Sequence, residues 1–495
     1  MGIIQKQAIK STFFSYAGTI FGFLNASILM PKILLSSDIG LLTFVNSTTK
    51  IMAAIFTLGV PLITQNLFTR YKNPNNKNNG FLSLIIWITL LGAILGSLLF
   101  FLLKDQLISS ENNAAKYYVF FSLSWVILFV FRLLFLNLDI YLRMNQKTVL
   151  GVFLENFLTK IIFLFGLIAY ILGIVHFDGV YWMNILAMSF PGLIILLYLI
   201  SRKERFFSFK YIKRYTVRGR EIGNLALFGM IGGIGSTFVT DIDKYMISNS
   251  INLSATGIYS VMMLFGMFTS ISSINLKRIA TPVVADSWKN KDMKNIDTIY
   301  KKSAVTQFLI GFYIFLGIWF CIDYVMQLLH FEVLYSYAKN VILFIALGQI
   351  IELATGVNAE IIATSKSYKW NTFFYLSLVG IVYTSNLIFI PIYGIEGAAL
   401  ATAVSFLIVN VARYFLLKIK YNLSPFSKEL GIAILIGLFV FALLSFIPVF
   451  QNGILGILLN GILVTVIFWG LTYVTKISLE VNGLIIKMSK FLNSK

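Results

Sequence analysis

The chain has 495 residues, of which 58% are hydrophobic and only 12% are charged, and its mean hydropathy is +0.84. A soluble protein carries about twice that charged fraction, so the composition excludes an ordinary soluble enzyme or binding domain. The formal net charge of +20 is explained by basic loops that set membrane topology and face anionic lipid, and nucleic acid is not an expected partner. With one cysteine, Cys321, and two histidines, His176 and His330, neither an internal disulfide nor a zinc site of the usual ligands is expected.

Apolar segments long enough to cross a bilayer recur along the whole chain, which predicts an all-α polytopic membrane protein. Glycines and prolines such as Pro31, Gly179 and Pro391 mark the ends of these segments, because both residue types interrupt helices. Fourteen spans are expected, at approximately 11–30, 41–66, 82–103, 117–138, 149–174, 180–200, 222–250, 255–276, 304–322, 338–359, 370–390, 395–417, 430–449 and 453–474.

The basic residues provide a test of this count. With fourteen spans, alternate loops lie on the same side of the membrane as both termini. That side holds 31 of the 40 basic residues, and the opposite side holds four. Because cytoplasmic loops are enriched in Lys and Arg, this distribution supports the count and predicts that both termini are cytoplasmic.

An internal repeat divides the chain. At an offset of 217 residues, 18–21 (GTIF) aligns with 235–238 (GSTF), and 37–40 (SDIG) aligns with 254–257 (SATG). Each repeat has six spans, an even number, so the two are parallel pseudo-repeats. The expected domains are a six-helix lobe at 1–200, a basic cytoplasmic linker at 201–221, a second six-helix lobe at 222–420, two additional transmembrane helices at 428–474 and an amphipathic cytoplasmic tail at 475–495.

Five basic residues lie within the predicted spans: Lys50, Arg132, Lys160, Lys244 and Arg413. A lipid-facing cation at the centre of a helix costs about 2.5–3.5 kcal/mol. Arg413 is close to a cytoplasmic end of its span, so its side chain is expected to snorkel to the interface. The other four are deeper and are expected to face the interior of the bundle.

Polar residues at helical spacing accompany these cations. In the seventh span, Asp241 precedes Lys244 by three residues, with Asp243 between them. Glu155 lies close to Lys160 in sequence, and further polar candidates are Asn25 and Glu352. Three interpretations remain open: a structural Asp241–Lys244 pair, cations that bind an anionic substrate, or carboxylates that couple transport to H⁺ or Na⁺. The excess of cations over acids in the first lobe favours an anion.

The chain resembles the Wzx-type O-antigen flippases, a polysaccharide-exporter branch of the multidrug/oligosaccharidyl-lipid/polysaccharide exporter superfamily. The resemblance covers essentially the full length and rests on the layout of six, six and two spans and on three motifs: 240–245 (TDIDKY), 255–260 (ATGIYS) and 393–399 (YGIEGAA).

The resemblance implies two lobes in the bacterial inner membrane that move undecaprenyl-pyrophosphate-linked oligosaccharide to the outer leaflet by alternating access, for the biosynthesis of a polysaccharide such as O-antigen, capsule or lipopolysaccharide. It implies that Lys50, Arg132, Lys160 and Lys244 contact the sugar-pyrophosphate headgroup. The residues that shape the cavity or take part in coupling would be Asp241, Asp243, Glu155, Glu352 and Asn25. The expected partners are the lipid-linked substrate, membrane lipids and polysaccharide polymerase or assembly proteins, with no cofactor apart from a coupling H⁺ or Na⁺.

Two alternatives share this fold. Lipid II flippases of the same superfamily also have fourteen spans. Drug/cation antiporters normally have twelve, and a cationic substrate would favour a more acidic cavity. A membrane enzyme is not expected, because the outer loops are short and the sequence has no nucleophile–base or metal-ligand constellation.

Overall fold

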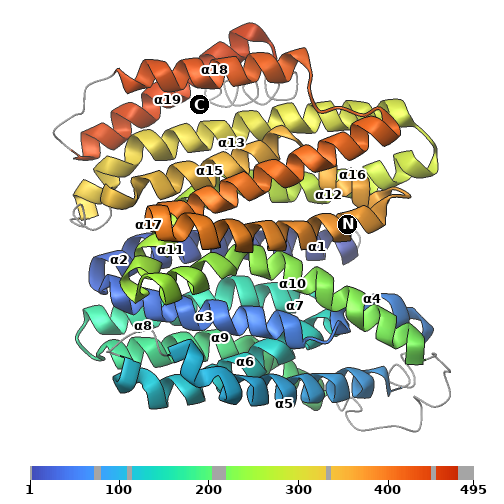
Figure 1. Ribbon diagram of the computed structural model, residues 1–495, viewed down its shortest axis with the longest axis vertical. Helices are drawn as coiled ribbons and strands as arrows, with labels where there is room; N and C mark the ends of the chain where they lie inside the picture. The colour runs from blue at the N-terminus through green and yellow to red at the C-terminus, as the bar shows by residue number, and fades with distance from the viewer. Residues whose placement is uncertain are drawn as a thin grey trace. The chain divides into compact units, whose positions relative to one another are not determined.

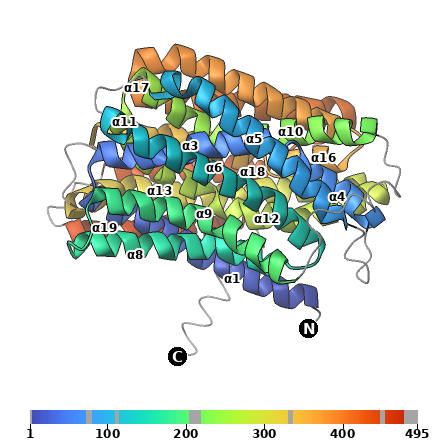
Figure 2. The same cartoon turned by 90° about the horizontal axis from the view of Figure 1, so that it is seen from below.

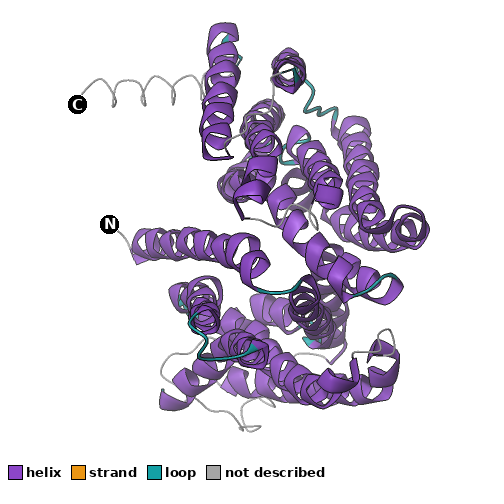
Figure 3. Cartoon of the chain, turned by 90° about the vertical axis from the view of Figure 1, so that its left-hand side faces the viewer, coloured by secondary structure: helices purple, strands orange, loops and turns teal. Residues whose placement is uncertain are grey.

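The computed structural model describes residues 3–71, 80–108, 114–202, 219–329, 336–446 and 453–477. Within these ranges nearly every residue is helical and none is in a strand (Figure 3). Most of the predicted basic linker, 203–218, and the predicted amphipathic tail beyond residue 477 lie outside the described residues.

The chain divides into two compact units, Met1–Gly257 and Ile258–Lys495. The first unit holds these helices and the first residues of α11 (Figure 1): α1 (Ile3–Phe23), η1 (Leu24–Leu29), α2 (Met30–Ile33), α3 (Ser36–Phe56), α4 (Val60–Tyr71), α5 (Phe81–Ile108), α6 (Ala114–Met144), α7 (Thr148–Val152), η3 (Phe153–Leu158), α8 (Thr159–Ile171), α9 (Phe177–Ser201) and α10 (Gly219–Ser250). The second holds the rest: α11 (Leu253–Met267), η5 (Phe268–Ser270), α12 (Ile271–Lys289), α13 (Met293–Leu329), η6 (Ser336–Ala338), α15 (Lys339–Ala354), α16 (Asn358–Thr364), α17 (Tyr368–Tyr421), α18 (Lys428–Ser445) and α19 (Gly453–Thr475).

Eleven helices in the described part of the chain are long and apolar enough to cross a membrane, and the number rises to 13 if each of two bent pairs is one span. The longest of them, α17, has 54 residues and leaves helical geometry at Gly394. At 1.5 Å per residue α17 is about 80 Å long, more than twice the roughly 30 Å of a bilayer core. If the parts of α17 before and after Gly394 are counted as two spans, the largest number of candidate spans rises from 13 to 14. This division agrees with the spans predicted at 370–390 and 395–417.

Helix packing places α10 in the first unit. There α6 packs along α9, α3 and α5, while α10 packs along α3 and α4 (Figure 2). Helices α4, α5, α6 and α9 enclose an apolar core that includes Phe68, Tyr71, Phe81 and Tyr141. The repeat puts α10 at the start of the second lobe, 222–420, whereas its contacts group it with the first unit; the lobe boundaries drawn from the repeat stay a prediction.

In the second unit, α13 is the central helix, with α12, α15, α18 and α19 packed along it. The core there is aromatic and aliphatic and includes Phe308, Phe312, Phe315 and Phe468. The two helices predicted as additional to the lobes, α18 and α19, thus bury one face each against α13. Their remaining faces are apolar and exposed, as Leu435 and Ile462 are, which is the pattern of helices surrounded by lipid.

The span predicted at 41–66 is two helices. Helix α3 ends at Phe56 and α4 begins at Val60. Between them Leu58 and Gly59 have φ angles of 49° and 70°, in the left-handed region that favours glycine. A side chain at Gly59 would also meet the Ala226 carbonyl oxygen of α10 at 2.3 Å, so the turn and the close packing of α10 both require this residue.

Gly40 and Gly257 are equivalent positions in the internal repeat, and each packs against the segment that contains the other. A Cβ at Gly40 would be 1.7 Å from the Leu253 carbonyl oxygen, and a Cβ at Gly257 would be 2.0 Å from the Ser36 carbonyl oxygen. The hydroxyls of Ser36 and Ser254 are 2.5 Å apart. A contact in which each of two equivalent segments touches the other in the same way is the pattern of a local two-fold axis.

We predict that Gly40→Ala lowers the thermal stability of the purified protein, because its Cβ would displace backbone rather than a flexible side chain. The matched control is Gly223→Ala in α10, where a Cβ meets no atom within 4 Å and alanine favours the helix by up to about 1 kcal/mol. The measurement is the midpoint of thermal unfolding in detergent. Equal midpoints for the two variants would contradict the close approach.

Candidate functional site

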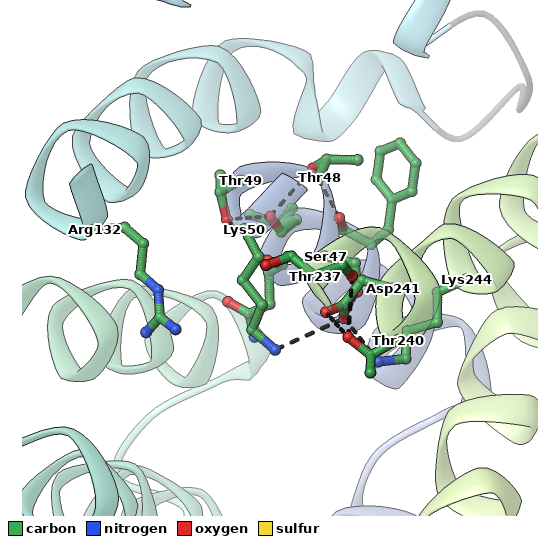
Figure 4. A network of polar contacts seen from close by, with 12 residues as sticks. Ser47, Thr48, Thr49, Lys50, Arg132, Thr237, Thr240, Asp241 and Lys244 are labelled. Carbon is green, nitrogen blue, oxygen red and sulfur yellow. Dashed lines mark hydrogen bonds and ion pairs between the residues drawn. The ribbon is translucent and has the colours of Figure 1, made fainter. Parts of the chain in front are cut away.

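A single buried carboxylate, that of Asp241 on α10, joins α10 to α3. Its Oδ1 atom lies 2.8 Å from Lys244 Nζ and 3.7 Å from Lys50 Nζ. The Ser47 hydroxyl donates to the same oxygen at 3.0 Å, and the Thr240 hydroxyl donates to Oδ2 at 3.1 Å (Figure 4). Only 5% of the Asp241 side chain is exposed, so these contacts replace the water that an ionised carboxylate needs.

Helical spacing explains why these groups meet. Ser47 and Lys50 are three residues apart on α3, and Asp241 and Lys244 are three apart on α10, so each pair shares a helix face. Because α3 and α10 pack along one another, the two faces form one polar contact between apolar surfaces. Asp243 is two residues from Asp241, about 200° around the helix, and it is also buried and has interactions of its own.

A second ion pair lies between α6 and η3. Arg132 Nη2 is 3.0 Å from Glu155 Oε1, and 17% and 28% of the two side chains are exposed. Glu155 belongs to a π-helical turn, η3, and Asn25 belongs to another, η1, in the first span. A π-turn inserts one residue into a helix and is frequent at functional sites.

The two π-turns anchor the first and fifth spans to each other. The Asn25 side-chain amide donates to the Lys160 carbonyl oxygen at 2.8 Å. Asn156 in η3 donates to the Ser15 hydroxyl at 3.2 Å, and a Cβ at Gly18 would be 1.8 Å from the Asn156 carbonyl oxygen. The Asn25 amide group therefore binds the backbone of the fifth span. Its side-chain oxygen, Oδ1, is buried and has no hydrogen-bond partner among the described residues.

Lys160 differs from the other three cations. Among the described residues, no carboxylate oxygen lies within 4.0 Å of its ammonium group. Its aliphatic stem runs past Gly22, where a Cβ would be 3.5 Å from Lys160 Cε. The charges that act on it most strongly are those of Lys50, Arg132 and Glu155.

These interactions join six side chains into one group, here called the unit-1 charge cluster: Lys50, Arg132, Glu155, Lys160, Asp241 and Lys244. Four cations and two carboxylates give it a formal excess of two positive charges. Two like charges 4 Å apart repel by about 4 kcal/mol at an effective dielectric constant of 20, so the excess favours an anion beside Lys160.

The structure brings together the four cations predicted from the sequence, and the predicted Asp241 and Glu155 are the counter-ions of three of them. The predicted roles of these residues remain predictions. Glu352 is not in this group, because it lies in the second unit and pairs with Lys277 on α12. The expectation that Arg413 snorkels was wrong: only 4% of Arg413 is exposed, and its guanidinium lies 5.3 Å from the Tyr375 ring centroid.

Sequence reasoning missed four polar residues for identifiable reasons. Ser47 is one turn before Lys50 and Thr240 directly precedes Asp241, so helix position alone could have found both. Lys277 was assigned to a loop, yet it lies within α12. Glu360 falls one residue beyond the span end predicted at 359, whereas α16 places it in its first turn, where it is half-buried.

We predict that Asp241→Asn destabilises the protein by about 3 kcal/mol, the low end for breaking a buried ion pair, because Lys50 and Lys244 lose their shared counter-ion. The additional change Lys244→Gln should restore part of the loss, since it removes one uncompensated cation. Thermal unfolding in detergent measures both effects, with Asp178→Asn, an exposed carboxylate on α9, as control. If Asp241→Asn unfolds at the wild-type temperature, Asp241 does not hold the cluster.

Comparison with known proteins supports the fold. No family model matches the chain, and no curated protein matches it by sequence. Among solved structures, a lipid II flippase, MurJ, in an inward closed conformation superposes with a TM-score of 0.73 at 16% identity, covering 95% of this chain and 100% of that one. An inward-facing multidrug resistance MATE family transporter of the MOP superfamily gives 0.59 at 12% identity over 83% and 94%. VcmN, a MATE transporter of Vibrio cholerae, gives 0.54 at 14% over 85% and 99%. The chain therefore has the fold of these polytopic transporters.

Proposed function

We propose that the protein is a flippase that moves a lipid-linked oligosaccharide, joined to undecaprenyl through a pyrophosphate, across the bacterial inner membrane. Transport would proceed by alternating access, and both termini would be cytoplasmic. The observation that carries the proposal is the unit-1 charge cluster, in which four cations exceed two carboxylates inside a fold shared with membrane transporters.

The chemistry of the cluster suits an anionic headgroup. Arg132 offers a planar guanidinium, and Lys50, Lys160 and Lys244 offer ammonium groups; both kinds of group bind phosphate oxygens. Three of these cations have a carboxylate within 4.0 Å, while Lys160 has none. In our proposal a diphosphate binds first at Lys160 and then shares Lys50 and Arg132 with their acidic partners.

The same balance of charge disfavours export of organic cations. A cationic drug entering this part of the first unit would meet a formal excess of two positive charges, with both carboxylates already paired. Hence the likeness to MATE transporters supports the fold of this chain more than their multidrug resistance role.

A lipid II flippase is the second candidate, and a specific observation favours it. The MurJ structure aligns over its full length and gives a TM-score of 0.73, higher than the MATE structures described above. Both candidates carry a polyprenyl diphosphate and differ in the attached sugar, so the cationic cluster serves either substrate.

The test is complementation of two bacterial strains, one lacking its oligosaccharide flippase and one depleted of its lipid II flippase. We expect the wild-type chain to restore surface polysaccharide in the first strain and not viability in the second. Restored viability alone would replace the first candidate with the second, and restoration of neither would contradict both.

We also predict that Lys160→Gln and Arg132→Ala each reduce surface polysaccharide at least tenfold while membrane abundance stays at the wild-type level. Removal of a charged hydrogen-bond donor to an anion costs about 1.5–3 kcal/mol, which is roughly ten- to a hundredfold. Lys160→Arg should retain most of the activity, because the cation remains.

Lys147→Gln serves as the control for both variants, since Lys147 lies over the Tyr198 ring and outside the charge cluster. Normal polysaccharide from Lys160→Gln at normal abundance would remove Lys160 from the headgroup site.

A further inference from the structure

The second unit contains a separate group of charged side chains, one buried and three half-buried, here called the unit-2 charge cluster: Lys277, Glu352, Glu360 and Arg413. Lys277 on α12 and Glu352 on α15 form an ion pair. Glu360 on α16 and Arg413 on α17 interact electrostatically with that pair and with each other. The four formal charges sum to zero when both carboxylates are ionised.

Glu360 has no close cation. Among the described residues no basic nitrogen lies within 4.0 Å of its carboxylate, and its Oε2 atom is buried without a hydrogen-bond partner. Lys277, the cation that acts on it most strongly, is already held by Glu352. This differs from Asp241, whose carboxylate has four polar neighbours.

Arg413 is also without an ion-pair partner among the described residues. Its guanidinium lies against the Tyr375 ring, and its Nε atom is buried with no hydrogen-bond partner. The hydroxyl of Tyr300, fully buried on α13, lacks a partner as well and interacts electrostatically with Arg413. Glu360, Arg413 and Tyr300 thus each have a buried polar atom without a hydrogen-bond partner in the described part of the chain, and Arg413 interacts electrostatically with both of the others.

Physical chemistry makes this arrangement reversible. A buried carboxylate without a close cation costs several kcal/mol when ionised, and it avoids that cost by taking a proton. Arg413, which stays charged in proteins, favours the ionised form from a distance. The neutral and ionised forms of Glu360 therefore each have one stabilising factor.

We propose that Glu360 is a proton-binding site that takes a proton from water and returns it, and that this proton is the one coupled to export. The coupling rests on the flippase function proposed above, whereas proton binding at Glu360 does not. Uptake changes the charge of the unit-2 charge cluster from zero to +1, and release restores it.

The groups that face Glu360 come from each helix around it. Those that act on it are Lys277 from α12, Glu352 from α15 and Arg413 from α17. Three tyrosines interact in turn with these cations or with one another: Tyr300 with Arg413, Tyr375 with Lys277 and Arg413, and Tyr414 with Tyr300. The other described charged side chains of α12, Asp286 and Lys289, are exposed. Lys277 and Arg413 are cations, and Glu352 is paired, so Glu360 is the group of this set that changes charge.

The site lies at a break between helices. Helices α15 and α16 are bent by 50°, and Gly356 between them has a φ angle of 59° and lies close to Tyr300 and Ser303 of α13. Glu352 is in the last turn before the break and Glu360 in the first turn after it. Interrupted helices in transporters commonly mark ion sites.

A native fluorophore reports on this position. The Trp288 indole nitrogen donates to the carbonyl oxygen of Ile361, the residue after Glu360, at 3.2 Å. We therefore expect the fluorescence of the purified protein to change with pH in the absence of any substrate, and Trp288→Phe to remove that change.

The first experiment compares the pH titration of Trp288 fluorescence, and the infrared band of a protonated carboxyl group, in Glu360→Gln and wild type. Glu360→Gln should abolish the titration and the band. Glu360→Asp should keep both at a shifted midpoint. Glu429→Gln, an exposed carboxylate in the same unit, should leave both unchanged.

An unchanged titration and band in Glu360→Gln would overturn the proton site. So would a response to added Na⁺ at constant pH with none to pH. Each variant is first shown to unfold at a temperature near that of wild type, and Glu360→Asp keeps the comparison valid if Glu360→Gln folds poorly.

The second experiment measures the dependence of transport on a pH gradient in proteoliposomes that contain lipid-linked oligosaccharide. Wild type and Glu429→Gln should transport at least tenfold faster with the gradient than without it, and Glu360→Gln should show no such difference. A Glu360→Gln protein that keeps the full dependence would overturn the coupling. Absence of transport in wild type would instead contradict the flippase function and leave the spectroscopic result unaffected.

Discussion

The contact between α3 and α10 depends on one buried carboxylate. Asp241 receives two hydroxyl hydrogen bonds and lies beside two ammonium groups, so a residue that is costly to bury becomes the polar link between two apolar helices. This link fixes where Lys50 and Lys244 lie, and it places α10 in the first unit. Asp241 and Lys244 form an ion pair, as the structural interpretation of these residues expects. The cluster also has more cations than carboxylates, as binding of an anionic substrate requires.

The fold followed from the sequence to a large extent because membranes constrain chains strongly. Apolar segments and the asymmetry of basic loops predicted the spans, and the 54-residue helix α17 contains two of them as expected. The break after Phe56 was not predicted, because the turn depends on the left-handed conformation of Leu58 and Gly59. A turn of this kind is stabilised by the helix that packs on it, here α10 through Ala226, and such packing is not visible in a local pattern.

The candidate site was predictable in composition and not in pairing. The cost of charge in a membrane singles out Lys50, Arg132, Lys160 and Lys244 from the sequence, and the structure places them together. Which cation meets which carboxylate depends on neighbouring helices, so the free Lys160 could not be recognised beforehand. Arg413 shows that position along a span does not by itself predict exposure: it is near a helix end, yet it is buried, with its guanidinium against the Tyr375 ring.

The π-turns in the first and fifth spans have a consequence for comparing this chain with its relatives. Each inserted residue rotates the helix on one side of it by about 100° relative to the other side. In a homologue without the inserted residue in Leu24–Leu29, the positions equivalent to Ser15 and Gly18 would be matched to these residues only by an alignment with a one-residue gap inside a transmembrane helix. Alignments that forbid such gaps would pair the wrong residues over half of that span, and identities counted from them would understate true relatedness.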